Sequence, residues 1–409
     1  MTPQASDSIQ ARRALNLLTA VNYLNYIDRF MLAALLSSIQ KDLHLSDFQG
    51  GLLATAFMLA YILTSPVFGW LVQRYQRTSL LTIGVSLWSF ASLITGLAGQ
   101  FSLMFSSRFL LGVGESMFTT VSAPFLTDYY KPERRARAFS IFASGATAGA
   151  ALGYVIGGLL GGYVGWRNSF FIAGIPGFIL AFFIYKLPEP SGEIRATSFH
   201  VGDAYRELRK NRPFICAVIG YTAFTFVVGG LAHWMPTYIQ RTFSYSPQDS
   251  NMLFGGIAVI NGFLGTLLGG FWSGRLKLKY DFGYLYFCAI CMFLVVPCFI
   301  ACFFTTHLIL FIAFMSLTQF LFFLPTSPIN VLIMECVPSA LRTMAMAISI
   351  FACHIFGDAI SSPLIGWISD QTGALRTGLV WCAPMVFLSG AFWLLGVQDR
   401  SSIKNLIVS

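Results

Sequence analysis

The sequence predicts an all-α membrane protein with twelve transmembrane helices in two pseudo-symmetric six-helix bundles. Of its 409 residues, 56% are hydrophobic and only 11% are charged, whereas soluble domains carry about 25% charged residues. Apolar runs of about 20 residues, the length that crosses a bilayer as a helix, recur along the whole chain. Polar loop sequences of the first half return in the second half. Because the runs are continuous and do not alternate, they favour helices over barrel strands.

The expected spans follow one another with short loops. They lie at about residues 14–39, 48–73, 79–100, 103–128, 136–163, 167–187, 213–241, 249–274, 283–305, 307–336, 341–370 and 376–397. The first run is too long for a signal-peptide core, and no small-residue cleavage site follows it, so it counts as a span.

A long polar stretch divides the chain after the sixth span. It begins with the helix breakers of PEPSG, and residues 201–212 suit a short helix on the membrane surface. We therefore expect an N-terminal bundle over 1–187, a cytoplasmic linker over 188–212 and a C-terminal bundle over 213–409.

The basic residues predict the orientation. With the amino terminus inside, most of the 26 Lys and Arg residues fall on the cytoplasmic side. The outer loops hold Lys41, Arg167, Arg241 and Arg376. This asymmetry predicts that both termini are cytoplasmic, and it accounts for the net charge of +9 without nucleic acid as a partner. Short loops and the absence of a cleaved leader favour a bacterial inner membrane.

Two loop sequences are repeated between the halves. DYYKPERRARAFSIF at 128–142 is echoed by ECVPSALRTMAMAISIF at 335–351, and GWLVQR at 69–74 is echoed by GFWSGR at 270–275. Two matching six-helix halves are the layout of transporters that bind their substrate near the middle of the membrane. The fifth span carries Gly at every fourth position from 145 to 161, which indicates close helix packing.

Four charged residues interrupt apolar spans. Asp28 and Arg29 lie in NYIDRF in the first span, and Arg108 and Glu115 share one face of the fourth span, about 10 Å apart along the helix. An isolated ion there costs several kcal/mol, so each acid is expected to neutralise a base. One interpretation is a proton or substrate switch facing a mid-membrane compartment. The alternative is a structural ion-pair network.

Other polar or aromatic side chains within spans are candidates for substrate contact. They are Tyr26, Thr119, His233, Trp234, Gln319, Asn330, His354 and Asp358. His354 and Asp358 are four residues apart and share a helix face, which suits either a proton relay or a structural pair. His233 precedes a kink expected at Pro236, and aromatic lining is its alternative role.

These residues resemble a known family. The loop GxxxQRxxR at 69–77, the Arg108-to-Glu115 segment and the six-plus-six organisation resemble the major facilitator superfamily of secondary transporters. NYIDRF at 25–30, GVGES at 112–116, APFLTDYY at 123–130 and ERRARAFSIF at 133–142 resemble its spinster group, whose members move lysophospholipids or sphingosine phosphate. The resemblance implies that Asp28, Arg29 and Glu115 serve ion coupling and gating, with Arg108 as their partner.

One position departs from the superfamily pattern. Gln73 stands where an acid usually helps to lock the halves together on the inner side. We expect a weaker inner gate, unless Asp128 with Arg134, Arg135 or Arg137 substitutes. The expected gate residues are Gln73, Arg74, Arg77, Asp128, Arg134 and Arg137.

The resulting prediction is a proton-coupled transporter that works by alternating access and moves an amphipathic lipid such as a lysophospholipid. A proton symporter for small organic anions is the first alternative, and a membrane sensor without transport is the second. No nucleophile, dyad or triad predicts an enzyme. Cys288-x-x-Cys291 lacks further ligands, so no metal or cofactor is expected. The expected partners are the substrate, protons and membrane lipids, and we expect a monomer.

Overall fold

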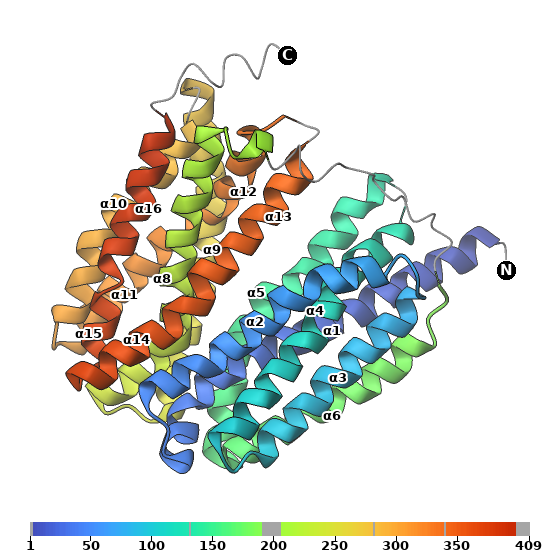
Figure 1. The fold of residues 1–409 in the computed structure, drawn as a ribbon, viewed down its shortest axis with the longest axis horizontal. Helices are drawn as coiled ribbons and strands as arrows, with labels where there is room; N and C mark the ends of the chain where they lie inside the picture. Colours follow the sequence, from blue (N-terminus) through green and yellow to red (C-terminus); the bar gives the residue numbers. More distant parts are fainter. Residues whose placement is uncertain (1–2, 131, 190–205, 281–282, 339–340, 398–409) are drawn as a thin grey trace. The chain divides into compact units, whose positions relative to one another are not determined.

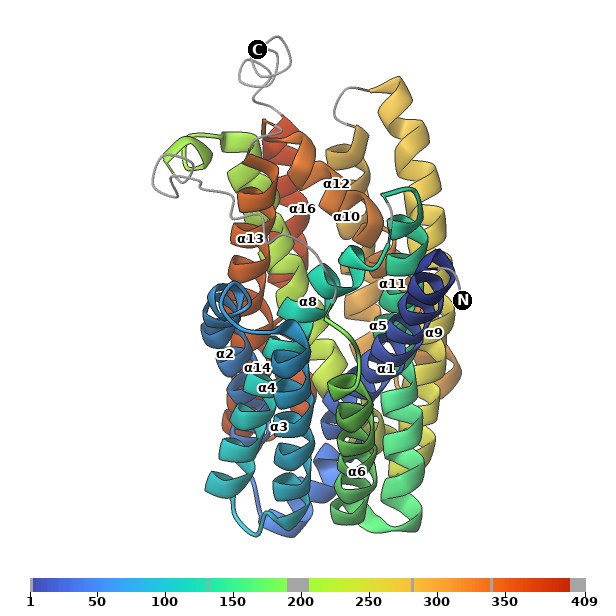
Figure 2. The same cartoon turned by 90° about the vertical axis from the view of Figure 1, so that its right-hand side faces the viewer.

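The computed structural model describes residues 3–130, 132–189, 206–280, 283–338 and 341–397. Over these residues every regular element is a helix (Figures 1 and 2). The first half forms α1 (Pro3–Leu43), α2 (Asp47–Leu71), α3 (Arg77–Leu97), α4 (Phe101–Asp128), α5 (Pro132–Tyr163) and α6 (Gly165–Tyr185). The second half begins with α8 (Arg212–Phe243), α9 (Pro247–Lys279) and α10 (Gly283–Phe304). The expected all-α fold is confirmed.

Within the described residues, 11 helical stretches are long and apolar enough to cross a membrane. The one remaining expected span, the first along the chain, is α1. Its polar residues Asn22, Asn25, Asp28 and Arg29 lower its hydropathy, although the helix itself is continuous over 41 residues. The chain is an integral membrane protein with multiple transmembrane helices.

Three spans expected as single helices are interrupted. The tenth is divided into α11 (Leu308–Phe323) and α12 (Thr326–Glu335), and the twelfth into α15 (Leu375–Val380) and α16 (Ala383–Val397). The eleventh contains a π-helical stretch, η2 (Cys353–Asp358), between α13 (Arg342–Ala352) and α14 (Ala359–Thr372). Pro325 lies at the first break, where a missing N–H ends the hydrogen-bond ladder. At the π-helix, the Cys353 carbonyl accepts a hydrogen bond from Thr225 Oγ1 of α8 at 3.3 Å.

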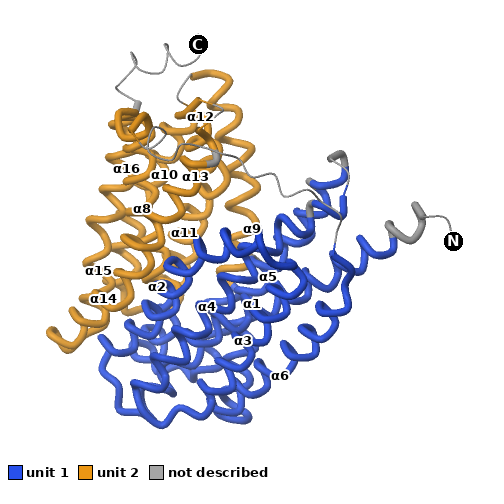
Figure 3. The backbone as a smooth tube through the Cα atoms, turned by 45° about the vertical axis from the view of Figure 1, so that its right-hand side comes forward, with its two compact units in different colours: residues 1–196, 233–256 blue, residues 197–232, 257–409 orange. Residues whose placement is uncertain are grey.

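The chain forms two compact units (Figure 3). Unit 1 comprises Met1–Ala196 together with His233–Gly256, and unit 2 comprises Thr197–Ala232 together with Ile257–Ser409. The expected bundle boundaries place His233–Gly256 in the second bundle, whereas the segment packs with unit 1. Part of the surface helix expected at 201–212 lies outside the described residues. In its described part, residues 206–208 are helical.

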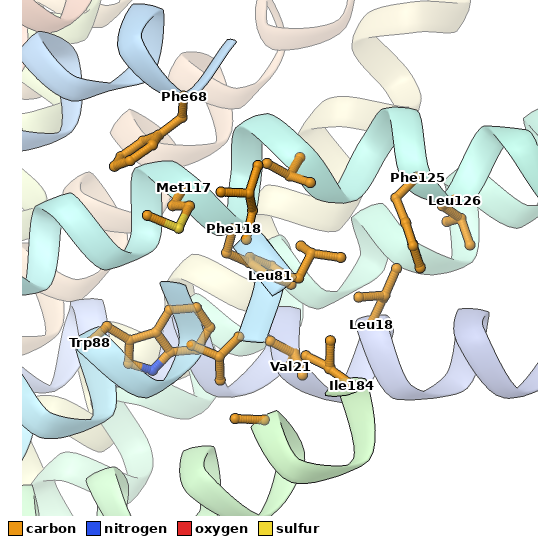
Figure 4. Close-up of a cluster of buried hydrophobic side chains, with 14 of the residues drawn as sticks. Leu18, Val21, Phe68, Leu81, Trp88, Met117, Phe118, Phe125, Leu126 and Ile184 are labelled. Atoms are coloured by element: carbon orange, nitrogen blue, oxygen red, sulfur yellow. The ribbon is translucent and has the colours of Figure 1, made fainter. Parts of the chain in front are cut away.

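The core of unit 1 brings α1, α3, α4 and α6 together (Figure 4). Trp88 of α3 packs edge-on against Phe118 of α4, with ring centroids 5.4 Å apart. The glycines of α5 face α1, as their spacing predicts. A Cβ on Gly153 would lie 2.8 Å from the Ile27 carbonyl oxygen, so only glycine permits this approach.

Candidate functional site

The charged quartet lies inside unit 1. Asp28 and Arg108 are each 1% exposed, and Glu115 is fully buried. The Arg29 side chain retains 16% exposure. The sequence predicts that all four face a compartment, whereas in this structure Arg29 alone among them has appreciable exposure.

The charges pair across helices. Arg29 Nη2 and Nε both donate to Glu115 Oε2, at 2.8 and 3.1 Å. Asp28 Oδ2 accepts a hydrogen bond from the Ser92 hydroxyl of α3. Arg108 lies close enough for its charge to act on both Asp28 and Glu115. The acid and base that are neighbours in NYIDRF therefore have different partners, because consecutive side chains of a helix point in different directions.

Three aromatic rings surround the Arg29 guanidinium. Its central carbon lies 4.9 Å, 4.6 Å and 5.4 Å from the ring centroids of Tyr26, Phe57 and Tyr61. Thr119 is linked to the same group, since its hydroxyl lies 2.7 Å from the Tyr61 hydroxyl and donates to the Glu115 carbonyl at 3.0 Å. Tyr26 and Thr119 are thus brought to the quartet. Sequence reasoning missed Phe57 and Tyr61, because no local pattern distinguishes them from other aromatic residues.

His233 and Trp234 are buried in unit 1. His233 Nε2 lies 3.1 Å from the Gly50 carbonyl oxygen, to which it donates. The two rings pack edge to face with centroids 5.1 Å apart. The hydrogen bond joins His233, at the start of the segment of α8 that belongs to unit 1, to α2.

The remaining substrate candidates belong to unit 2. His354 Nδ1 and Asp358 Oδ2 are 2.9 Å apart within the π-helical stretch, so the two side chains pair as their spacing predicts. Asn330 Nδ2 donates to the Thr326 carbonyl at 3.4 Å. Gln319 is buried, and its Oε1 has no hydrogen-bond partner among the described residues. A role of these four in binding stays a prediction.

Arg77 is the centre of the expected inner gate. Its guanidinium pairs with Asp128 and, at 2.9 Å, with Glu189. Asp128 therefore pairs with Arg77, and its expected partnership with Arg134, Arg135 or Arg137 stays a prediction. The side chains of Arg134 and Arg137 are exposed.

Gln73 and Arg74 lie at the end of α2. Gln73 Nε2 donates to the Gly69 carbonyl at 3.5 Å, and the Arg74 guanidinium lies 4.1 Å from the Trp70 ring centroid. Both contacts are local, so neither residue joins the Arg77 cluster through them.

Glu189 is a cluster member that sequence reasoning assigned to the linker. Its carboxylate accepts from the backbone N–H groups of Arg77 and Thr78, at 3.2 and 3.0 Å, and from the Thr78 hydroxyl at 2.9 Å. The N-cap residue Gln76 makes no side-chain capping bond, so Glu189 caps α3 from a distance. Burial raises the pKa of Glu189, but these hydrogen bonds outweigh it and hold the pKa below its usual value.

A second polar cluster was also missed. Arg241 donates to both oxygens of Asp47 at 2.7 Å and to Gln40 Oε1 at 3.2 Å. Gln40 Nε2 in turn donates to Asp47 Oδ1 at 2.8 Å. We call Gln40, Asp47 and Arg241 the latch, because they fasten the segment His233–Gly256 to α1 and α2 within unit 1.

No group of three or more His, Cys, Asp or Glu side chains suited to a metal ion occurs in the part of the chain that the structure describes. Cys288 and Cys291 are buried in α10.

Known proteins resemble the chain over nearly its whole length. The Major Facilitator Superfamily profile matches residues 18–358. The chain is 31% identical over 411 residues to protein spinster homolog 1 of Xenopus tropicalis, covering 91% of this chain and 78% of that protein. It is 29% identical to "Probable sphingolipid transporter spinster homolog 2" of Arabidopsis thaliana, covering 94% and 87%.

Solved structures show the same fold. A bacterial homolog to the human lysosomal transporter Spinster, crystallised in an inward-facing and unoccupied conformation, matches with a TM-score of 0.85 at 21% identity, over 97% of this chain and 98% of that one. A D-xylose-proton symporter matches with a TM-score of 0.73 at 17% identity, over 93% and 96%. The chain therefore belongs to the major facilitator superfamily and, within it, to the spinster family of transporters.

Proposed function

We propose that this transporter works by alternating access, couples movement to protons and carries an amphipathic lipid such as a lysophospholipid. One observation carries the proposal: the partly exposed Arg29 is paired with the buried Glu115 and surrounded by three aromatic rings. The names of the spinster relatives, which include a probable sphingolipid transporter, agree with a lipid substrate.

The chemistry of Arg29 suits an anionic headgroup. A guanidinium binds phosphate or carboxylate through parallel N–H groups, and its planar face stacks on aromatic rings. The rings of Tyr26, Phe57 and Tyr61 place apolar surface beside this charge. A molecule with an ionic head and an apolar tail matches both features.

Glu115 supplies the coupling. When an anionic headgroup binds to the Arg29 guanidinium, the buried Glu115 loses its ion pair with Arg29. A buried carboxylate without a partner is costly, so it binds a proton instead. The substrate and a proton are thereby loaded together. Asp28, held by Ser92 and the charge of Arg108, is the second proposed proton-binding acid.

The other predicted residues complete the proposal. His233, Trp234, Gln319, Asn330, His354 and Asp358 are proposed to contact the substrate during the transport cycle. The Arg77, Asp128 and Glu189 cluster is the proposed inner gate. We further propose bundles over 1–187 and 213–409, cytoplasmic termini, a monomer and a bacterial inner membrane.

Reconstituted uptake tests the proposal. Purified protein in proteoliposomes is offered a panel of lysophospholipids with and without an imposed pH gradient, and we expect uptake to follow the gradient. Glu115→Gln should abolish the dependence on the gradient while counterflow exchange continues. Glu335→Gln is the control, because that acid pairs with Lys277 at an exposed site.

Two results would count against the proposal. If uptake by the Glu115→Gln variant still follows the pH gradient, Glu115 is not the residue that couples transport to protons. Displacement of bound substrate by small organic anions and not by lysophospholipids would favour the organic-anion symporter.

A further inference from the structure

The interior of unit 1 holds a group of polar atoms without partners. They are Asn25 Nδ2 and Oδ1, Asp28 Oδ1, Trp88 Nε1, Arg108 Nε and Nη1, and Glu115 Oε1. None of these atoms makes a hydrogen bond to any described residue. All five residues are at most 1% exposed. Neither Asn25 nor Trp88 has a role in the transport mechanism proposed above.

The register of the helices brings these residues to neighbouring levels. Arg167 bonds both Asp42, at the end of α1, and the Ala98 carbonyl, just after α3, so α1 and α3 run in parallel. The hydrogen bond from Ser92 to Asp28 aligns the two helices. One turn earlier on each helix are Trp88 and Asn25.

Helix α4 brings Glu115 to the same region. A Cβ on Gly114, the residue before Glu115, would lie only 2.6 Å from the Trp88 backbone nitrogen. The indole of Trp88 lies within the packed core of α1, α3, α4 and α6 (Figure 4). Asn25 and Trp88 therefore lie at about the level of the two buried acids in unit 1.

Leaving these atoms unsatisfied would be expensive. A buried polar group without a partner gives up the hydrogen bonds that it makes to water in the unfolded chain, and folded domains are too marginally stable to leave several such groups unpaired. The group contains both donors, on Trp88, Asn25 and Arg108, and acceptors, on Asp28, Glu115 and Asn25. Water both donates and accepts. A metal cation suits the site poorly, because the guanidinium and indole N–H groups would repel it.

We propose that ordered water molecules occupy this group, with Asn25 and Trp88 as their ligands alongside Asp28, Arg108 and Glu115. Buried waters typically make about three hydrogen bonds to such groups. The waters connect Asp28 to Glu115 across α1 and α4. Their role as a proton path rests on the proposed proton coupling, to which this site would add Asn25 and Trp88 as positioning residues.

X-ray radiolytic labelling of the full chain tests the hydrated site. Radiolysis of a bound water produces a hydroxyl radical that oxidises the side chain beside it, even when bulk solvent is excluded. Trp88 is compared with Trp393, which is equally buried but donates its Nε1 hydrogen to the Ala217 carbonyl at 3.2 Å. We expect Trp88 to be oxidised at least fivefold faster than Trp393. Equal rates in the unmodified protein would overturn the proposal.

Substitutions test the proton path separately. Trp88→Phe keeps an aromatic six-membered ring but removes the five-membered ring with its N–H group, and it should lower proton-driven uptake about tenfold while counterflow exchange is retained. Unchanged proton-driven uptake would contradict the path. Labelling requires no transport, so the outcomes are distinguishable. If Trp88 is labelled but uptake is not driven by protons, the proposed function is contradicted and the water site stands. If Trp88 is not labelled but transport is intact, only the water site is contradicted.

Discussion

At the scale of single residues, Arg29 combines two kinds of contact that the other members of the quartet do not show together. It forms an ion pair with Glu115 and lies against three aromatic rings. Lysine carries the same charge but has neither the planar face nor the fork of donors. The identity of the cation at position 29 therefore matters as well as its charge.

Arg29→Lys should weaken lysophospholipid binding about tenfold or more, because the bidentate and stacking contacts are lost although the charge remains. The measurement is ligand affinity in detergent, alongside uptake in proteoliposomes. Arg376→Lys is the control, since Arg376 also stacks on a ring, that of Phe304, at 4.4 Å, but belongs to unit 2. Equal effects of the two substitutions would show that Arg29 has no special role.

At the scale of elements, Glu189 connects the end of the first half to the start of α3. Its carboxylate satisfies helix N–H groups that have no partner within α3, and a negative charge there also favours the helix dipole. Its lowered pKa means that the ionised form is favoured by folding. The stabilisation is therefore present above the usual pKa of a glutamate and is lost as the pH falls through the lower folded value.

Glu189→Gln should lower the free energy of unfolding by about 1 kcal/mol at neutral pH, since the charge-assisted bonds become neutral and the group is partly exposed. Thermal unfolding in detergent at pH 7 and at acid pH measures this. The difference between variant and unmodified protein should shrink at acid pH, where the side chain at position 189 is neutral in both. A difference that is the same at both pH values would contradict the assignment.

The glycine face of α5 makes a second prediction at this scale. Gly153→Ala places a methyl group 2.8 Å from the Ile27 carbonyl of α1 and should destabilise the protein by about 1–3 kcal/mol. Gly256→Ala in α9 is the matched control. A Cβ there meets no atom within 4 Å, so the substitution should be neutral or stabilising by up to about 1 kcal/mol. The melting temperatures of the two variants measure this difference. Equal shifts would contradict the role of Gly153 in the close packing of α5 against α1.

At the scale of the whole molecule, the latch fastens a segment of the second half to the first two helices. Ser37 of α1 also hydrogen-bonds Gln240 of α8 beside it. In the proposed alternating access, these contacts must break and form again in each cycle. The latch is therefore expected to set how readily this end of unit 1 opens.

Arg241→Gln should raise severalfold the rate at which the segment His233–Gly256 separates from α1 and α2, because Asp47 loses both of its hydrogen bonds from Arg241. Labelling of Ser37→Cys by a membrane-impermeant maleimide measures the opening. Arg167→Gln is the control, since its ion pair with Asp42 joins α6 to α1 without involving the segment His233–Gly256. Labelling that both substitutions leave unchanged would argue against a latch.

Much of the architecture was predictable from the sequence, because a membrane helix satisfies its backbone hydrogen bonds within its own segment. The breaks were less predictable. The π-helical stretch Cys353–Asp358 accepts a hydrogen bond from Thr225 of another helix, a contact that no local pattern indicates. The glycines of α5 were interpretable as a packing face, since their spacing alone places them on one side of the helix.

By itself, the sequence determined that the protein is helical and lies in a membrane, and that Asp28, Arg29, Arg108 and Glu115 are exceptional. An ion within an apolar run is visible without any knowledge of its surroundings. Only the tertiary structure decided that Arg29 pairs with Glu115 among aromatic rings, and that Glu189 caps α3. Those partnerships depend on the register and facing sides of helices far apart in the sequence, which hydrophobic periodicity does not encode.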